Sequence, residues 1–357
     1  MSDLYLPEDP VVLQEGNLRL GTTGFRNALQ EEALRITGNA ETPSPNQPNK
    51  RVARYRPRGS MTILDNNLNI IRPLVGVKVC ASWWWYNATG ITDGNGNYRC
   101  DDTFSNGHKV TYSLDWERYE FQIRSGWYYT AECNGPQTNA SWSRNFEAGD
   151  AQYLYATTFM AAMDYYYGDI QGLLRPKKNC FICSKMKLSV YDEPCECFNG
   201  EFFDIRGTFG LLSQIKIYNN VNYHIPQIYT TVIHELTHSA HYEISPYHFI
   251  FADDIVLESW SCGVGWFMAF RKWPNYFHKY GRAKGNTVKS HDYTGIVQDL
   301  MDGIDVSNGD MVEGYTIAEI QAALIAKCKM NDWKENLKTK YNNATEENLD
   351  ALFDYWN

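Results

Sequence analysis

The sequence is short of positive charge and of long apolar runs. It has 33 Lys and Arg residues against 42 Asp and Glu residues, a net charge of −9 and a pI near 5.4. An acidic balance of this kind argues against a nucleic-acid-binding surface. No apolar stretch approaches the roughly 18 residues that a membrane-spanning helix needs. We therefore expect neither a nucleic-acid partner nor a transmembrane segment.

Internal repeats and a secretion signal are also missing. The lack of a repeat excludes solenoids and propellers. The sequence begins MSDLYLPEDPVV, which contains neither the basic region nor the apolar core of a signal peptide. Two interpretations stay open: a cytosolic protein, or a mature chain whose leader was removed and replaced by Met1, with surface anchoring through that leader.

Aromatic residues, in contrast, are abundant. They make up 15% of a chain of 357 residues, which is long enough for two or three domains. Tyrosine is the most frequent of them and suits sheets and binding faces, because its apolar ring carries a polar tip. The run from Trp83 to Tyr86 is either a ligand-stacking platform or a combination of core packing and a sheet edge, and we favour the second interpretation.

The nine cysteines include one cluster with metal-ligand character. The cluster consists of Cys180, Cys183, Cys195 and Cys197. It resembles a four-thiolate metal knuckle, but the second pair has one spacer residue where zinc ribbons have two or more. Two disulfides or plain thiols are the alternatives, and the spacing does not choose among the three.

Turn residues and strand patterns divide the N-terminal third. Residues 1–58 form an accessory segment, with a short helix expected at 27–36 and closely spaced prolines at 43–48 that no helix tolerates. Residues 59–127 alternate as strands do, around the glycine-rich turn Asp93–Asn97. A polar connector is expected at 134–143.

Three segments of this strand-rich region carry a family resemblance. Pro73–Val79, Thr92–Tyr98 and the late strand with Tyr119 resemble the carboxypeptidase regulatory-like, or transthyretin-like, β-sandwich. The resemblance implies a sandwich over 59–127. Because such domains accompany secreted or surface proteins, it also implies a secreted, periplasmic or cell-surface location.

The periodicity changes after the connector. Residues 151–167 present a stripe at helical spacing, and strands are expected at 187–191, 201–205 and 211–218. Within the last of these, polar and apolar residues alternate, as in a half-buried or edge strand. The residues concerned are Gln214, Lys216 and Tyr218.

The chemistry is concentrated in the motif His234-Glu235-Leu-Thr-His238. Residues i and i+4 lie on one face of a helix, so both imidazoles can converge on one metal ion. Glu235 is rotated to the side, where it can reach a water on that ion without binding the metal itself. Pro226 before the motif and Pro246 after it are typical of the two ends of such a helix.

A third ligand is required, and three positions compete for it. The metzincin pattern fails, because His241 and Ile244 stand where it needs glycine and histidine. His248 has no regular spacing to the motif. Glu258 lies on a second helical segment, and a loop at 245–252 can turn the chain back so that this carboxylate meets the two histidines.

This arrangement resembles the gluzincin metallopeptidases, the clan that includes thermolysin. The resemblance implies one zinc ion bound by His234, His238 and Glu258, with Glu235 as general base. It also implies that an extended peptide substrate pairs with an edge strand, which we assign to Gln214, Lys216 and Tyr218.

Two positions depart from the family pattern. Thermolysin-like enzymes carry an aspartate four residues after the zinc glutamate, where this chain has Cys262. Asp254 is the candidate to support a histidine ligand in its place, although capping of the helix by Asp253 or Asp254 is an equal alternative. Tyr293 and Tyr315 are the candidates for stabilising the oxyanion.

The C-terminal part is expected to be helical. A capping box opens a helix at Thr316, and residues 348–356 form another. The predicted architecture is α+β and multidomain, with a β-sandwich and then a zincin-like unit at 135–357. Its upper part covers about 150–245 and its helical lower part about 250–357. The predicted function is a zinc-dependent metallopeptidase that hydrolyses peptide bonds with a zinc-activated water. The alternatives are an inactive zincin-like surface binding protein and a zinc hydrolase of non-peptide substrates.

Overall fold

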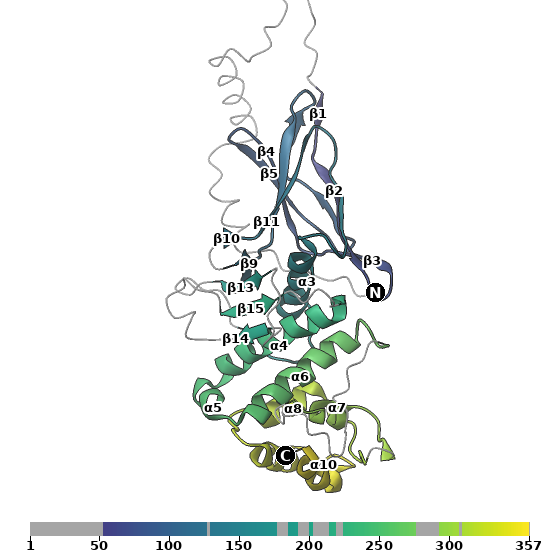
Figure 1. The fold of residues 1–357 in the computed structure, drawn as a ribbon, viewed down its shortest axis with the longest axis vertical. Coiled ribbons are helices and arrows are strands. Elements are labelled where there is room, and N and C mark those ends of the chain that lie inside the picture. The colour runs from purple at the N-terminus through teal and green to yellow at the C-terminus, as the bar shows by residue number, and fades with distance from the viewer. Residues whose placement is uncertain are drawn as a thin grey trace, which may run out of the picture.

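The protein has a sheet-rich end, a helical end and a mixed sheet between them (Figure 1). The computed structural model describes residues 53–126, 129–176, 185–191, 200–202, 214–218, 224–275, 293–306 and 309–356. Both sheets and helices contribute, so the chain belongs to the α+β class. No helix among the described residues is long and apolar enough to cross a bilayer.

The strands occupy the first two thirds of the chain. In chain order they are β1 (Arg54–Tyr55), β2 (Arg58–Asp65), β3 (Ile70–Pro73), β4 (Lys78–Trp83), β5 (Tyr86–Ile91), β6 (Asn97–Arg99), β7 (Phe104–Ser105), β8 (Val110–Asp115), β9 (Phe121–Ser125), β10 (Tyr129–Thr130), β11 (Glu132–Thr138), β12 (Arg144–Phe146), β13 (Met186–Tyr191), β14 (Gly200–Phe202) and β15 (Ile215–Tyr218).

The helices occupy mainly the last third. They are α3 (Tyr153–Tyr167), α4 (Ile225–Ile244), α5 (Pro246–Phe251), α6 (Asp254–Phe270), α7 (Ile296–Met301), α8 (Ile317–Leu324), α9 (Met330–Lys340), the 3₁₀ turn η3 (Glu346–Asn348) and α10 (Leu349–Trp356).

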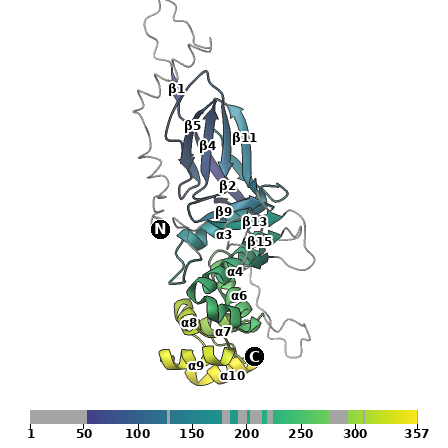
Figure 2. The same ribbon diagram turned by 90° about the vertical axis from the view of Figure 1, so that its left-hand side faces the viewer.

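Two sheets form the β-sandwich-like end of the molecule (Figure 2). One has the strand order β11-β8-β4-β5, and the other has the order β12-β2-β3, with β6 also paired to β2. Strand β8 shows why they pack, since Val110, Tyr112 and Leu114 are buried while the residues between them are more exposed. This alternation gives the sheet one apolar face, which is buried against the other sheet.

The middle layer is a five-stranded mixed sheet with the order β10-β9-β13-β15-β14. Strands β9, β13 and β15 run parallel, whereas β10 and β14 pair antiparallel at its two edges. Helix α3 contacts β9, and α4 contacts β14 and β15. Strand β13 is buried along nearly its whole length, as a central strand of a covered sheet is.

The observed sheets correct the predicted limits of the sandwich. Strand β9 was expected within 59–127 as a sandwich strand, but it pairs with β13 in the middle sheet. Conversely, the expected connector at 134–143 contains most of β11, and β11 and β12 complete the sandwich. The reason is that alternation reveals which face of a strand is buried, not which strand is its partner.

Several predicted elements are confirmed. Helix α3 matches the stripe at 151–167, and β13 matches the strand at 187–191. The capping box at Thr316 opens α8 as expected. The loop expected at 245–252 instead contains the short helix α5. The helix predicted at 27–36, the proline-rich linker and the four-cysteine cluster lie outside the described residues.

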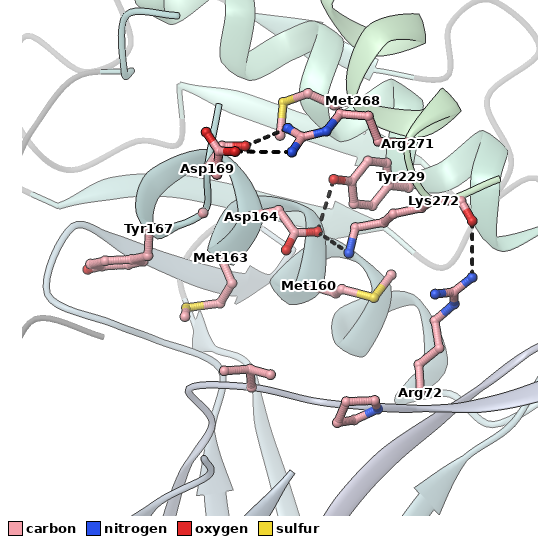
Figure 3. A pocket seen from close by; sticks show the side chains of 13 residues that line it. Arg72, Met160, Met163, Asp164, Tyr167, Asp169, Tyr229, Met268, Arg271 and Lys272 are labelled. Atoms are coloured by element: carbon pink, nitrogen blue, oxygen red, sulfur yellow. Dashed lines mark hydrogen bonds and ion pairs between the residues drawn. The ribbon is translucent and has the colours of Figure 1, made fainter. Parts of the chain in front are cut away.

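A cavity of about 500 Å³ marks the junction between the sandwich and the helices (Figure 3). Ion pairs line it: Lys272 Nζ lies 2.9 Å from Asp164 Oδ2, and Arg271 pairs with Asp169 at 3.3 Å. Tyr229 on α4 donates to the same Asp164 oxygen at 2.9 Å. These contacts tie α3 to α4 and to the end of α6.

Asp65, at the end of β2, connects the sandwich to the segment after α6. Its buried Oδ2 accepts hydrogen bonds from Arg72 Nε at 2.7 Å and from Trp273 Nε1 at 2.5 Å. Although burial alone would raise it, the pKa of Asp65 is lowered, because Arg72 and Trp273 stabilise the carboxylate. The charged form is therefore the one that the fold requires.

We predict that Asp65→Asn lowers the free energy of unfolding by about 2–4 kcal/mol at neutral pH, because it breaks a buried charged pair. A carboxyl whose pKa is lower in the folded state stabilises the protein above its unfolded pKa, near 4, and this contribution is lost as the pH falls further. Thermal unfolding across pH should thus show the difference from the wild type shrinking below about pH 4. The partly exposed Lys78–Asp115 pair, at 3.5 Å, supplies the control. Asp115→Asn should cost less than about 1 kcal/mol, and equal losses in the two variants would contradict the role of Asp65.

Candidate metal centre

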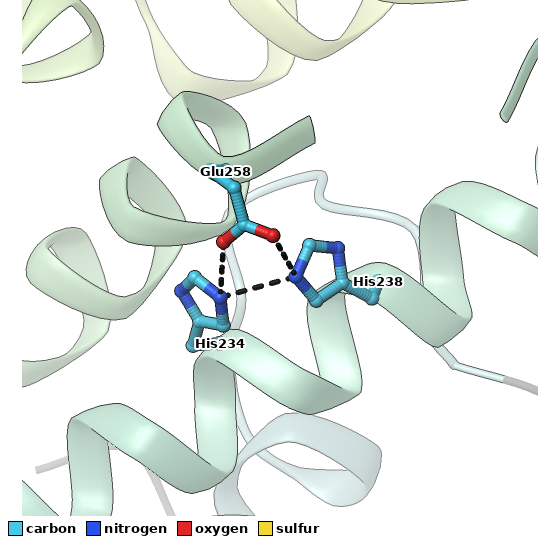
Figure 4. Close-up of side chains that lie close together, drawn as sticks. All are labelled: His234, His238 and Glu258. Atoms are coloured by element: carbon cyan, nitrogen blue, oxygen red, sulfur yellow. Dashed lines mark hydrogen bonds and ion pairs between the residues drawn. The ribbon is translucent and has the colours of Figure 1, made fainter. Parts of the chain in front are cut away.

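Helices α4 and α6 pack together and bring three predicted ligands to one point (Figure 4). His234 Nε2 and His238 Nε2, one turn apart on α4, lie 3.0 Å from each other. Glu258 on α6 lies across from them, with Oε2 3.0 Å from His234 Nε2 and Oε1 3.4 Å from His238 Nε2. The second helix and the return of the chain therefore place Glu258 where the spacing predicts.

The donor atoms have the separation that a small tetrahedral ion requires. Bonds of about 2.0–2.1 Å to zinc at tetrahedral angles place two ligand atoms about 3.3 Å apart. The three observed separations lie between 3.0 and 3.4 Å. Two imidazole nitrogens and one carboxylate are also a usual protein donor set for catalytic zinc. The residues present therefore fit a zinc ion in donor chemistry and in spacing.

The outer ring nitrogens of both histidines are held by α6. Ser261 Oγ lies 3.1 Å from His238 Nδ1, and Cys262 Sγ lies 3.5 Å from His234 Nδ1. These contacts leave both Nε2 atoms directed at the centre (Figure 4). Metal-binding histidines are commonly oriented in this way by a partner on the opposite nitrogen, which fixes the tautomer and the ring plane.

The electrostatics of the centre favour a cation. The hydrogen bonds from His234 and His238 hold the pKa of Glu258 well below its usual range, despite the opposing effect of burial. Burial also opposes charge on His234, yet the neighbouring Cys262, Glu258 and Glu235 raise its pKa well above the ordinary value. The group of side chains thus stabilises positive charge at the point where the donor atoms converge.

Glu235 lies beside the three ligands. Its side chain is buried, and burial together with the nearby Glu258 and Glu201 raises its pKa to about 7, while His234 opposes the shift. A carboxyl with a pKa near neutrality can both accept and release a proton. Strand β14 lies directly over it: a Cβ atom on Gly200 would be 2.6 Å from Glu235 Oε1. Only glycine allows this approach.

Aromatic side chains border the centre. The ring of Phe202, at the end of β14, is stacked on that of His238 with their centroids 6.2 Å apart. The ring of Phe249, on α5, meets the His238 ring edge-on with their centroids 6.0 Å apart. Tyr293 stacks at 6.2 Å from His234. The side chain of Glu258 is still 23% exposed and that of His234 13% exposed. Part of each of these two side chains is therefore open to solvent.

Three predictions about the surroundings are corrected. The strand with Gln214, Lys216 and Tyr218 is not an edge, because β15 lies between β13 and β14. Asp254 is exposed in the first turn of α6, whereas Cys262 contacts His234 in the supporting role proposed for that aspartate. Tyr315 is buried near Glu319 and Glu346, outside the centre.

Of the other candidates, Tyr293 reaches the centre. Burial together with Glu258 raises its pKa, so its phenol stays protonated. His248 bonds to Ser245 at 2.6 Å and is not one of the grouped ligands. Sequence reasoning missed Ser261, which the helical spacing from Glu258 could have indicated. It also missed Gly200 and Phe202, because their proximity depends on how β14 pairs.

The described residues contain a second group of acidic side chains with closely spaced oxygens. The group consists of Asp299, Asp302 and Asp310. It has no histidine, and Asp299 accepts a hydrogen bond from Trp356 Nε1 at 2.9 Å. Asp299 and Asp310 are buried and Asp302 is half-buried. Because carboxylates alone often gather without binding an ion, the chemistry of the chain is better sought at the histidines.

Comparisons with known proteins add no identification. No protein-family model matches the sequence, and neither the curated proteins nor the solved structures give a significant match. The site must be interpreted from its own geometry.

We predict that Gly200→Ala destabilises the protein by about 1–3 kcal/mol, because the added methyl overlaps Glu235 and Thr231 and must displace β14 or the carboxylate. Gly94→Ala is the matched control, since a Cβ there has no neighbour within 4 Å. Differential scanning calorimetry of the two variants tests the prediction. A Gly200→Ala protein as stable as Gly94→Ala would show that β14 does not approach α4 so closely.

Proposed function

We propose that the protein is a zinc-dependent metallopeptidase of the gluzincin type. The observation that carries the proposal is the convergence of His234, His238 and Glu258, whose donor atoms lie 3.0–3.4 Å apart. A neighbouring buried carboxyl, Glu235, supplies the acid–base group that hydrolysis needs. The same four residues carry the sequence motif, so spacing along the chain and arrangement in space support the same function.

The three ligands would hold zinc with support from α6. Zinc bound there would supply Lewis acidity, which polarises a carbonyl and makes a water molecule easier to deprotonate. With zinc in place of the protons now shared with Glu258, contacts of Ser261 and Cys262 with the two Nδ1 atoms would hold each imidazole with its Nε2 lone pair towards the ion. Glu258 contributes the negative charge, and its lowered pKa keeps it ionised throughout the neutral range.

Glu235 is placed to move the proton. Its carboxyl accepts a proton from the attacking water and later delivers it to the amine that leaves the cleaved peptide. Burial favours this double role, because it raises the pKa towards neutrality. Tyr293 can donate a hydrogen bond to the oxygen that becomes negative during attack, because its phenol remains protonated.

The edge of the middle sheet supports an extended peptide as substrate. Among the strands that the structure describes, β14 pairs with β15 on one side and with no strand on the other. Its Gly200 lies over Glu235 and its Phe202 stands beside His238. A peptide that adds to this edge as a further strand would bring its carbonyl groups past the centre.

We predict that the wild type binds one more equivalent of zinc than His238→Ala, because the variant loses a ligand. Comparison with this variant distinguishes zinc bound at the centre from zinc bound by cysteines elsewhere in the chain. Cys262→Ala should bind that ion about 10–100-fold more weakly in a chelator competition, because His234 loses its support. Cys80→Ala, in the sandwich, is the control and should bind zinc as the wild type does. Equal zinc content in wild type and His238→Ala would refute the metal site.

We predict that Glu235→Gln keeps its zinc and lowers kcat/KM by a factor of roughly 10²–10⁴, because the general base is gone. Digestion of an unbiased peptide library identifies the substrate and gives the rate. A Glu235→Gln protein with full activity would refute the role of this carboxyl. Zinc without cleavage of any peptide would favour a binding protein of this fold, and activity on non-peptide esters or amides alone would favour a different hydrolase.

A further inference from the structure

The turn between β4 and β5 exposes two neighbouring tryptophans. Trp83 pairs with Tyr86 across the hairpin, so Trp84 and Trp85 form its two-residue turn. Their side chains are 53% and 63% exposed, whereas Trp83 and Tyr86 pack against the core. Core packing therefore explains only half of the aromatic run. Two exposed indoles side by side form an apolar patch, and exposure of such a patch to water is unfavourable unless a partner covers it.

The backbone of this turn is also unfavourable for tryptophan. Trp84 has a φ of 56°, in the left-handed region that glycine and asparagine adopt most easily. A bulky aromatic residue at the first turn position destabilises the folded protein in two ways, through backbone strain and through exposure of its ring to water. A bulky aromatic residue at such a position is a candidate for a role in binding.

The tryptophans form the tip of the hairpin and rest on a stack of rings. Trp83 is stacked between two rings, with the His108 centroid at 3.8 Å and the Trp84 centroid at 5.6 Å. Trp85 leans against Trp84 at 5.1 Å. The stack supports the tip from below and directs its outer indoles to solvent. A small polar ligand or a sugar is usually bound in a concave site with converging polar groups, which a two-residue turn does not provide.

The tip lies at the end of the molecule farthest from the metal centre. Strand β4 begins at Lys78, near the junction cavity lined by Val75, and runs away from it to Trp83. Figure 1 shows β4 and β5 rising towards β1, at the end opposite α10. A surface bound at the tip would therefore leave the centre and β14 accessible.

The described residues beside this turn carry a small excess of positive charge, in an otherwise acidic chain. Residues 79–92 contain no charged side chain, and neither do residues 133–143. The segments 54–56 and 101–109, which pack beside the hairpin, contribute three basic side chains, Arg54, Arg56 and Lys109, against Asp101 and Asp102. Arg54 and Lys109 are exposed. The whole chain, in contrast, carries a net charge of −9.

We propose that this end of the sandwich docks on an anionic lipid surface, with Trp84 and Trp85 inserted at the level of the headgroups. Indole rings favour the boundary between water and hydrocarbon. The basic residues add attraction to acidic headgroups, and such surface binding needs both contributions. The inference concerns location and stands whether or not the metal centre hydrolyses peptides.

Co-sedimentation with lipid vesicles tests the proposal. The full chain should bind vesicles of phosphatidylcholine with about one third phosphatidylserine, should bind pure phosphatidylcholine more weakly, and should dissociate as salt rises. Trp84→Gly should weaken binding roughly tenfold. The same variant should unfold at an unchanged or higher temperature, because glycine adopts the positive φ without strain. Lost binding then cannot be attributed to lost folding.

Two further variants complete the test. Tyr129→Ala removes a 78% exposed aromatic side chain on β10, outside the sandwich, and should leave binding unchanged. Lys109→Gln should weaken binding to the acidic vesicles roughly fivefold and leave binding to neutral vesicles unaltered. Undiminished binding by Trp84→Gly would overturn the proposal. So would binding confined to a polysaccharide, or a dimer that forms through the tip and excludes the vesicles.

Discussion

The close packing of α6 on α4 is the constraint on which the rest of the site depends. Gly265 on α6 lies against Thr230 on α4, where an added Cβ would be 3.0 Å from the threonine methyl and 3.2 Å from its carbonyl oxygen. The helices can approach this closely because glycine stands there. Glu258 lies two turns earlier on α6, so the same approach brings its carboxylate to 3.0 Å from His234. The middle sheet and α3 hold α4 from its other side.

This packing gives the two carboxyl groups of the centre opposite properties. Glu258 meets two imidazoles, and their hydrogen bonds lower its pKa and keep it charged. Glu235, next to His234 in the chain, is buried beneath Gly200 of β14, and its pKa is raised to about 7. One carboxyl is thus suited to hold a cation and the other to exchange protons. The proposed hydrolysis would use such a division between neighbouring carboxyls.

Much of the centre could be predicted from the sequence, because its parts are local. Helical spacing alone places His234 beside His238, and the proline positions predicted the limits of α4. What could not be predicted depends on partners distant in the chain. Strand β9 has the alternation of a sandwich strand, yet its partner is β13, and β15 is covered by β14. Trp84 was expected in a core or at a sheet edge, since composition does not show that the hairpin turns at that residue.

Anomalous diffraction at the zinc absorption edge, from crystals of the zinc-loaded protein, would locate the ion itself. We expect one peak about 2.0–2.2 Å from His234 Nε2, His238 Nε2 and a carboxylate oxygen of Glu258. Glu235 should lie next to this ion without binding it. An ion bound by the two histidines but not by Glu258, or no ion between α4 and α6, would contradict the account.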